Sequence, residues 1–352
     1  MKIVIVVSSR NMQYGAGMNR VIYNAYSELI REFDEVIIVS AKNSKELFLG
    51  VIKLLKSNPC SFDFIIFNSL SSIRKSHNKF WYLFWLLASV FKIRKVMYWH
   101  EMPNYLKKFK DNKENKRDMI LINRFLLNKK IKHLSVSSES AKSSYFLNAT
   151  TESTVVYNTI ISKPKFSLLY STFTVATVGS IQYIKGTDIW TDVAISVCNA
   201  NKDIQFVWCG GALDKQLYYN CVEKIAKNKL SDRIFFIGHF EDAVSIISAS
   251  HLYFSSSRLD SFPLSILEAM SQGKNCIFYE SGGIKEALSG LGTLIQDFDI
   301  DRTKNAILSK KMNFDVDTQS VFNQNIYNQF KENFTPEVFV NNLKKALRDD
   351  FS

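Results

Sequence analysis

Short apolar segments alternate with longer segments of helical periodicity along the whole chain. Residues 2–8 are almost entirely apolar and β-branched, whereas in residues 19–33 apolar side chains recur every three or four positions. Apolar runs this continuous suit strands that are buried on both faces of a parallel sheet. The alternation therefore predicts an α/β fold. In the first half, we expect strands at residues 2–8, 35–41, 62–69, 95–101, 133–139 and 154–160.

The same pattern restarts after a break around Pro164. A chain of 352 residues also exceeds the size at which one hydrophobic core keeps growing. We therefore predict two doubly wound Rossmann-like domains, residues 1–165 and 166–324, with the C-terminal helix, about 325–352, returning to the first. The strands of the second domain are expected at residues 174–180, 204–211, 233–239, 251–257, 275–281 and 293–298.

Positive charge is concentrated in one part of the chain. Residues 92–132 hold thirteen Lys and Arg against four acidic residues, which is +9 of a net charge of +12. The aromatic run at residues 80–91 precedes them, and its twelve residues are too few to span a bilayer, which needs about 20 in a helix. Residues 80–132 therefore favour adsorption to an anionic membrane surface. The alternatives are a solvated lysine-rich loop over a helix that packs on the sheet and, less favoured, a nucleic-acid surface.

The five cysteines are odd in number and widely spaced, and no two form a CxxC pair. This pattern suggests neither a disulfide framework nor a zinc site, and we expect buried free thiols in strands. Free thiols fit a reducing compartment. With the short apolar run at the N-terminus, which is typical of a first strand, they predict a cytoplasmic protein. Residues 80–132 add the expectation that it is peripheral on the cytoplasmic face of the inner membrane.

The segment DSFPLSILEAMSQG, residues 260–273, has the most specific pattern. Pro263 suits the first position of a helix and Gly273 its end, with Ser261 as a candidate cap. The first amides of such a helix point outward and form an anion site suited to a diphosphate. Asp260 and Glu268 would flank this helix start at the edge of the sheet where ligands bind. On spacing alone, a surface Asp and a Glu in the capping region of a helix are the favoured explanation.

No GxGxxG motif follows the first strand, and GxxxxGK[ST] occurs nowhere. Dinucleotide oxidoreductases and P-loop enzymes therefore lose their main support. Gly15 and Gly17, after the first strand, would let the backbone approach a ligand beside a helix start, although glycines in such turns also serve structure alone.

Residues 260–273 resemble the donor-binding signature of retaining glycosyltransferase family 4, the "group 1" glycosyltransferases, which have the GT-B fold. That signature is a Glu, seven residues, a second Glu, Ala-Met and a Gly. Further resemblances follow in family order, densely in the second half and more loosely in the first, and together they cover nearly the whole chain. They are YGAGMNRVIYN (14–24), YWHEMP (98–103), VVYNTI (155–160), GSIQYIKG (179–186), VWCGG (207–211) and ESGGIKEAL (280–288).

The resemblance implies roles for individual residues. Lys185 would neutralise the donor diphosphate and stabilise the departing nucleotide. Asp260 would hold hydroxyls of the transferred sugar, and His100, from the other domain, would contact the donor sugar or its phosphate. Glu268 would accept hydrogen bonds from the ribose. The other donor-side residues are Gly15, Gly17, Gly179, Leu264 and Ser265 with their amides, Gly283 and Glu286.

Two positions depart from the family pattern. Asp260 stands where the family has Glu, so its carboxylate is set back by about 1.5 Å, one carbon–carbon bond. Ser180 replaces an Arg that would hold a phosphate with two hydrogen bonds. Arg258, just before the signature, is a candidate substitute for that Arg, or else it faces solvent.

The resemblance implies transfer of a sugar from a UDP-, GDP- or dTDP-linked donor to a saccharide acceptor, with retention of anomeric configuration and without a cofactor or metal ion. We expect a polyprenyl-diphosphate-linked acceptor, in bacterial O-antigen or capsule biosynthesis, and no nucleic-acid partner. The alternatives are transfer to a soluble acceptor, a GT-B sugar-nucleotide epimerase, and an inactive nucleotide-sugar-binding module, which Asp260 and Ser180 leave open.

Overall fold

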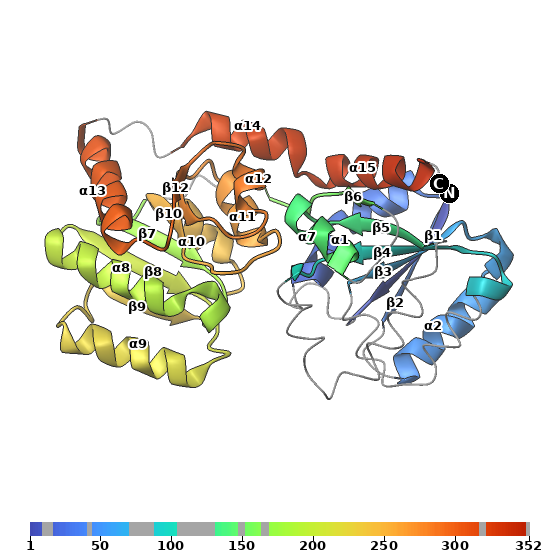
Figure 1. Cartoon of the computed structure of the whole chain (residues 1–352), viewed down its shortest axis with the longest axis horizontal. Helices are drawn as coiled ribbons and strands as arrows, with labels where there is room; N and C mark the ends of the chain where they lie inside the picture. Colours follow the sequence, from blue (N-terminus) through green and yellow to red (C-terminus); the bar gives the residue numbers. More distant parts are fainter. Residues whose placement is uncertain are drawn as a thin grey trace. The chain divides into compact units, whose positions relative to one another are not determined.

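The computed structural model describes residues 1–8, 17–40, 44–69, 88–103, 131–146, 152–162, 169–316 and 322–349. The chain divides into two compact units (Figure 1). Unit 1 comprises Met1–Ile161 and Phe334–Ser352, and unit 2 comprises Ser162–Asn333.

Unit 1 is built on a six-stranded, fully parallel sheet with the strand order β2-β1-β3-β4-β5-β6. This extends the flavodoxin-like order, which reverses direction between β1 and β3. The inner strands are buried along most of their length, which explains their continuous apolar runs. The elements are β1 (Lys2–Val7), α1 (Gly17–Glu32), β2 (Glu35–Ser40), α2 (Ser44–Lys56), η1 (Pro59–Ser61), β3 (Phe64–Asn68), β4 (Arg94–Trp99), β5 (Ile131–Ser135), α7 (Ser138–Phe146), β6 (Ser153–Val155) and α15 (Pro336–Arg348).

Unit 2 has a second six-stranded parallel sheet, in the order β12-β11-β10-β7-β8-β9. Numbered from β7, this is the Rossmann order 3-2-1-4-5-6, which reverses direction between β7 and β10. The elements are β7 (Phe173–Val178), η3 (Tyr183–Lys185), α8 (Thr187–Ala200), β8 (Ile204–Cys209), α9 (Lys215–Lys227), β9 (Ile234–Gly238), α10 (Ala243–Ala249), β10 (Leu252–Ser255), α11 (Leu264–Ser271), β11 (Cys276–Tyr279), α12 (Ile284–Leu288), β12 (Thr293–Ile295), α13 (Ile300–Val316) and α14 (Gln324–Asn333).

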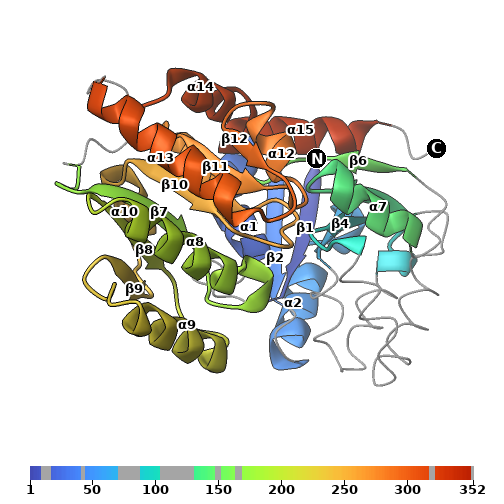
Figure 2. The same cartoon turned by 60° about the vertical axis from the view of Figure 1, so that its left-hand side comes forward.

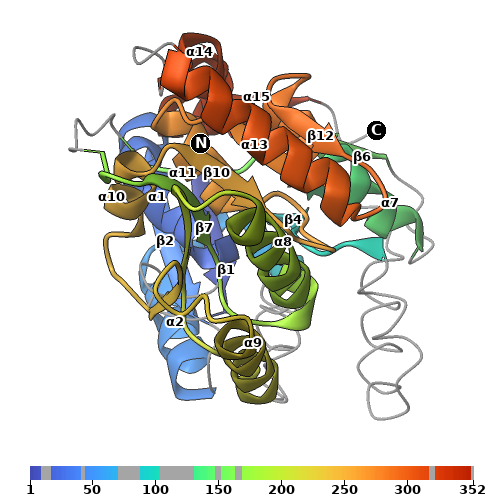
Figure 3. The ribbon, with the colours of Figure 1, turned by 90° about the vertical axis from the view of Figure 1, so that its left-hand side faces the viewer.

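Helices cover both faces of the second sheet. Helices α9, α8 and α13 form one layer, and α10 and α11 lie on the opposite face (Figures 2 and 3). Under the first layer Trp190 meets Trp208 edge to face, with ring centroids 5.2 Å apart, and both rings are fully buried. Both sheets, with all twelve expected strands, confirm the predicted pair of Rossmann-like α/β domains.

The boundary near the C-terminus differs from the expected one. We predicted a return to the first domain near residue 325, but α14 belongs to unit 2 and the return comes at Phe334. The reason is packing, because Ile326 and Phe330 of α14 are buried and this helix lies against α11. In unit 1, α15 packs on α1, and the Thr159 hydroxyl donates to the Phe334 carbonyl at 2.7 Å.

The cysteines are free, and four of them are buried. Two parts of their prediction are wrong: Cys60 is exposed, and Cys198 and Cys221 lie in helices. Among the described residues, no helix is long and apolar enough to cross a membrane.

Candidate functional site

Two loops of unit 2 meet where its sheet reverses direction. Strands β7 and β10 are hydrogen-bonded neighbours, yet their following connections diverge to the two halves of the sheet. The loop after β7 begins at Gly179, and the loop after β10 begins at Ser256. In open α/β sheets, ligands bind at this switch point, outside the carboxyl ends of the strands.

Each loop supplies one charged side chain to the same place. Lys185 ends the short helix η3, and its ammonium group forms an ion pair with the carboxylate of Asp260. The Lys185 side chain is 23% exposed and that of Asp260 is 12% exposed. The stem of Lys185 also lies over Gly179, where an added Cβ would be 3.8 Å from its Cδ. The structure therefore brings together two of the residues that the resemblance singled out, as partners of one another.

Hydrogen bonds join the two loops. The Ser256 hydroxyl donates to the Lys185 carbonyl at 2.9 Å, and the Arg258 amide donates to the Ile184 carbonyl at 2.9 Å. Gly186 has a φ of +66°, and a Cβ there would be 1.9 Å from the Ser256 carbonyl oxygen. Only glycine fits this position, because any side chain would strain the backbone and collide with the neighbouring loop.

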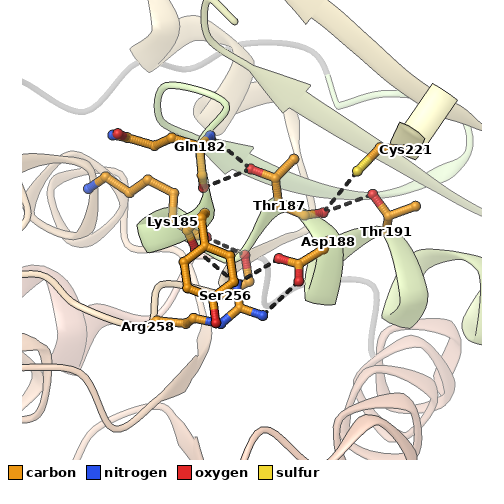
Figure 4. Close-up of polar contacts among 9 residues, drawn as sticks. Gln182, Lys185, Thr187, Asp188, Thr191, Cys221, Ser256 and Arg258 are labelled. Atoms are coloured by element: carbon orange, nitrogen blue, oxygen red, sulfur yellow. Dashed lines mark hydrogen bonds and ion pairs between the residues drawn. The ribbon is translucent and has the colours of Figure 1, made fainter. Parts of the chain in front are cut away.

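Arg258, the candidate substitute for the missing phosphate-binding Arg, binds residues of its own site in this structure. Its guanidinium donates to both carboxylate oxygens of Asp188, at 2.6 and 2.7 Å, and to the Tyr183 carbonyl at 2.8 Å (Figure 4). It also lies over the Tyr183 ring, 4.0 Å from the centroid. The guanidinium is thus bonded to residues of the loop after β7. Its side chain is only 20% exposed, so it does not extend into solvent.

Helix α11 begins one residue later than predicted. Pro263 is its N-cap residue in extended conformation, with no side-chain cap, so Ser261 does not cap the helix. The amides of Leu264 and Ser265 open the helix and have no acceptor within it. Gly273 lies just beyond the helix end with a φ of +59°, as expected for a stop.

Glu268 is buried inside α11, with 3% of its surface exposed. The pKa values of Tyr253 and of the Cys209 thiol are raised, in both cases mainly by burial. The negative charge of Glu268 raises both of them further. The Glu268 charge is therefore felt at β10, which holds Tyr253, and at β8, which holds Cys209.

The remaining donor-side predictions have mixed outcomes. The Gly283 amide donates to the carbonyls of Asp260 and Ser261, at 3.3 and 3.0 Å, so it holds the Asp260 loop and is not open to a phosphate. Glu286 is half-buried in the first turn of α12. The Gly179 amide bonds to the Cys209 carbonyl at 3.0 Å, which fixes the start of the Lys185 loop.

In unit 1, His100 lies directly after β4 and is buried. Its Nε2 is 3.0 Å from Asn68 Oδ1, and Asn68 Nδ2 donates to the Met18 carbonyl at 2.8 Å. Asn68 Oδ1 is thus the acceptor, and His100 Nε2 carries the proton. Burial lowers the pKa of His100 to about 3, so the ring is neutral near pH 7. Asn68, at the end of β3, thereby fixes the tautomer.

Other predictions of unit 1 fall partly outside the described residues. Gly17 is the first residue of α1 and is exposed, whereas Gly15 lies outside the described part of the chain. The same holds for residues 80–87 and 104–130 of the predicted membrane-binding region. Over the described ranges, no group of three or more His, Cys, Asp or Glu side chains is arranged to hold a metal ion.

Sequence reasoning missed the residues that support the site. These are Tyr183, Asp188 and Ser256 in unit 2 and Asn68 in unit 1. Asn68 is the last residue of a buried strand and Ser256 directly follows one, which is a signal for a polar residue at the ligand edge of a sheet. Asp188 gave a weaker signal, as an acid in the first turn of a predicted helix.

Comparisons with known proteins bear on both units. Residues 162–328 match the family "Glycosyl transferases group 1". Among curated relatives, the lipopolysaccharide core biosynthesis mannosyltransferase LpsB of Rhizobium meliloti is 29% identical over 114 residues, 32% of either chain. One component of the phosphatidylinositol N-acetylglucosaminyltransferase of Arabidopsis thaliana is 28% identical over 136 residues, 38% of this chain and 30% of that protein. The matches thus span about a third of these relatives' length.

Likeness to solved structures extends over the whole chain. HepE of Anabaena, solved in complex with UDP, aligns with a TM-score of 0.72 over 99% of both chains, at 16% sequence identity. At so low an identity, the structural likeness establishes the fold alone. The chain therefore has the GT-B fold, and its residues 162–328 match the group 1 glycosyl transferases in sequence.

Proposed function

We propose that this protein is a glycosyltransferase that uses a nucleotide sugar as donor. The observation that supports this most is the Lys185–Asp260 ion pair, at the switch point of the second sheet and within the segment that matches the family. A cation at this point can neutralise a diphosphate, and the carboxylate that it releases can accept hydrogen bonds from sugar hydroxyls. HepE, which shares the fold, was solved with UDP.

The chemistry follows from what these groups can do. As the bond from the anomeric carbon to the phosphate oxygen breaks, negative charge grows on the diphosphate. Lys185 and the amides that open α11 would stabilise that charge in place, so no metal ion is needed in the proposed reaction. We propose front-face attack by the acceptor hydroxyl, with its proton passing to the leaving phosphate, which retains the anomeric configuration.

His100, in unit 1, has a defined protonation state. With its proton on Nε2 and directed to Asn68, the neutral ring offers Nδ1 as an acceptor only. We propose that it orients a hydroxyl of the donor sugar and does not act as an acid, since a group with a pKa of about 3 is a poor proton donor near pH 7.

A donor screen tests the proposed function. We expect one of UDP-, GDP- or dTDP-linked sugars to raise the melting temperature with saturation, because a ligand that binds only the folded state stabilises it by mass action. The same donor with a saccharide acceptor should release the nucleoside diphosphate in the presence of EDTA, and NMR of the product should show the donor's anomeric configuration. Turnover of the donor without acceptor into a second nucleotide sugar would make the protein an epimerase. Saturable binding without any turnover would make it a binding module.

We further propose a lipid-linked acceptor, such as a polyprenyl-diphosphate saccharide in surface-polysaccharide synthesis, reached at the cytoplasmic face of the inner membrane. The support is the basic segment 92–132 beside the aromatic run 80–91. LpsB acts in lipopolysaccharide core biosynthesis by its name, and the Arabidopsis relative is named for phosphatidylinositol.

Vesicle binding tests this second proposal. The protein should co-sediment with phosphatidylglycerol vesicles at about 50 mM NaCl, and much less at about 500 mM NaCl or with phosphatidylcholine, because charge attraction is screened by salt. Each basic residue near the surface contributes about 1 kcal/mol. Serine at Lys107, Lys108, Lys110 and Lys113 should thus abolish binding. Serine at four exposed lysines of unit 2 (Lys215, Lys224, Lys227 and Lys229) is the control and should retain it. Equal loss in both variants would refute a specific membrane-binding segment.

A further inference from the structure

Arg258 contacts the loop after β7 in several ways. Its guanidinium binds both oxygens of Asp188 at 2.6 and 2.7 Å, donates to the Tyr183 carbonyl at 2.8 Å and lies over the Tyr183 ring. Two parallel hydrogen bonds to one carboxylate fix direction as well as distance. The guanidinium therefore contacts both ends of the segment that carries Lys185, the first residue of η3 and the first turn of α8.

Arg258 and Asp188 each stabilise the charged form of the other. Burial would raise the pKa of the Asp188 carboxyl, but the hydrogen bonds and the charge of Arg258 outweigh it, so that the pKa is lowered. The hydrogen bond to Asp188 likewise raises the pKa of Arg258. Side-chain exposure is 20% for Arg258 and 39% for Asp188, so the pair is partly shielded from water.

Lys185 lies inside the clamped segment but is not itself held by the clamp. In Figure 4 its amine points away from the Arg258–Asp188 pair. The backbone here is held by the loop after β10. The Lys185 carbonyl accepts from the Ser256 hydroxyl at 2.9 Å, and the Ile184 carbonyl accepts from the amides of Arg258 and Leu259 at 2.9 and 3.2 Å. The ammonium group is thus presented from a fixed backbone, in ion contact with Asp260 two residues beyond Arg258.

We propose that Arg258 is a positioning residue for the diphosphate site: with Asp188 and Tyr183 it clamps the loop after β7 to the loop after β10 and so sets where Lys185 and Asp260 stand. This inference rests on the proposed function for the identity of the ligand, but the clamp is a property of the ligand-free protein. A misplacement of about 1 Å in a charged group can lower a rate by about a hundredfold. A clamp of this kind therefore affects function without touching the ligand.

Hydrogen exchange in the ligand-free protein tests the clamp alone. Arg258→Met keeps an unbranched, flexible side chain and removes the guanidinium fork of donors. It should speed exchange at the amides of Lys185, Gly186, Arg258 and Leu259, which all donate to backbone carbonyls across or within the two loops. Arg233→Met is the matched control, since Arg233 also binds two carbonyls of unit 2, those of Cys198 and Asn201. Exchange at the four loop amides that does not differ between the two variants would overturn the proposal.

Ligand binding separates positioning from direct contact. The probes are whichever of UDP, GDP and dTDP binds the unaltered protein most tightly, and the corresponding nucleoside monophosphate. Their dissociation constants would be measured for Arg258→Met, Arg258→Lys, Asp188→Asn and the double variant that combines Arg258→Met with Asp188→Asn. If Arg258 positions the site, Arg258→Met and Asp188→Asn both weaken diphosphate binding, by about tenfold or more, with a smaller loss for the monophosphate. The double variant is then no worse than Arg258→Met, because both changes break one interaction. Lysine should not rescue, since it lacks the fork.

The opposite pattern has a clear meaning. If Arg258 binds the phosphate itself, Asp188→Asn frees the guanidinium and leaves binding unchanged or tighter, while Arg258→Met abolishes it, and the proposal is overturned. If exchange responds as expected but no nucleotide binds the unaltered protein, the clamp stands and the proposed function fails. The experiments therefore distinguish failure of the positioning role from failure of the proposed function.

Discussion

Replacing Lys185 by alanine should lower the rate of sugar transfer by about two to three orders of magnitude, the usual effect of removing one preorganised group from a developing charge. The reason is the position of its ammonium group, beside Asp260 and at the switch point of the second sheet. The measurement is kcat and KM for the donor identified by the thermal screen. Lys224→Ala is the control, because Lys224 is also an ion-paired lysine of unit 2, bound to Asp192 on the helical layer. Equal rates in both variants would exclude Lys185 from the reaction.

Asp260 should respond in a different way from its partner. Asp260→Asn removes the charge that competes with the diphosphate for Lys185, so binding of the nucleoside diphosphate should tighten or remain equal while transfer falls steeply. Lys185→Ala should weaken both. Asp260→Glu restores the length found in the family, and rates with different donor sugars should show whether the shorter side chain selects the sugar. If Asp260→Asn loses diphosphate affinity as Lys185→Ala does, the ion pair is structural and no exchange of partners takes place.

Mild acid should destabilise the protein strongly, and unit 1 more than unit 2. Burial lowers the pKa of His100 to about 3 and that of His133 to about 4, both in unit 1. Burial, with the charges of Lys274 and Lys311, lowers the pKa of His251 in unit 2 to about 4. Unfolded histidines titrate near 6.5. Between pH 6.5 and about 4, the unfolded chain therefore binds more protons than the folded chain, and stability falls as the pH falls.

Each of these histidines contributes a slope of about 1.4 kcal/mol per pH unit in this window. For two histidines the loss in unit 1 is about 2.7 kcal/mol per pH unit, and for one in unit 2 about half of that. Hydrogen exchange, measured for individual peptides at a series of pH values from about 7 down to about 5, would give the stability of each unit separately. Above about pH 6.5 the stabilities should no longer depend on these groups.

Substitution of single histidines checks the assignment. His133 accepts from Trp99 Nε1 at 2.9 Å, and a glutamine oxygen can take that hydrogen bond, so His133→Gln should halve the slope of unit 1. Exposed His239 is the control, and His239→Gln should leave both slopes as they are. A slope in unit 1 that persists in full after His133→Gln would show that other groups carry the pH dependence.

The sequence was most informative where burial alone decides structure. Inner strands such as β1 and β3 are buried on both faces, so almost every side chain must be apolar, and the apolar run marks the strand. At the edge this signal is weaker, and β6 covers only Ser153–Val155 where seven residues were expected. The C-terminal boundary was missed because α14 and α15 have the same helical periodicity, and only the contacts of Ile326 and Phe330 assign α14 to unit 2.

The candidate site was predicted in its parts and not in its connections. Lys185, Asp260 and Glu268 each stand in a segment with a family resemblance, and the structure leaves their roles as predictions. The partner of Arg258 lies 70 positions earlier in the chain, and no local pattern indicates which acid a surface Arg will meet. Gly283 was placed on the donor side by resemblance, and a glycine pair looks alike in sequence whether its amides bind a ligand or a neighbouring loop.

The discontinuity of unit 1 has a consequence for biosynthesis. Its last helix, α15, buries Phe339, Val340 and Leu343, and it packs on α1 near the start of the chain. Domains generally fold in the order in which they leave the ribosome. Here α15 is translated only after the whole of unit 2, so the unit that emerges first is completed last. The face of α1 that awaits α15 must remain uncovered throughout that interval, and chaperones have their longest opportunity to bind there.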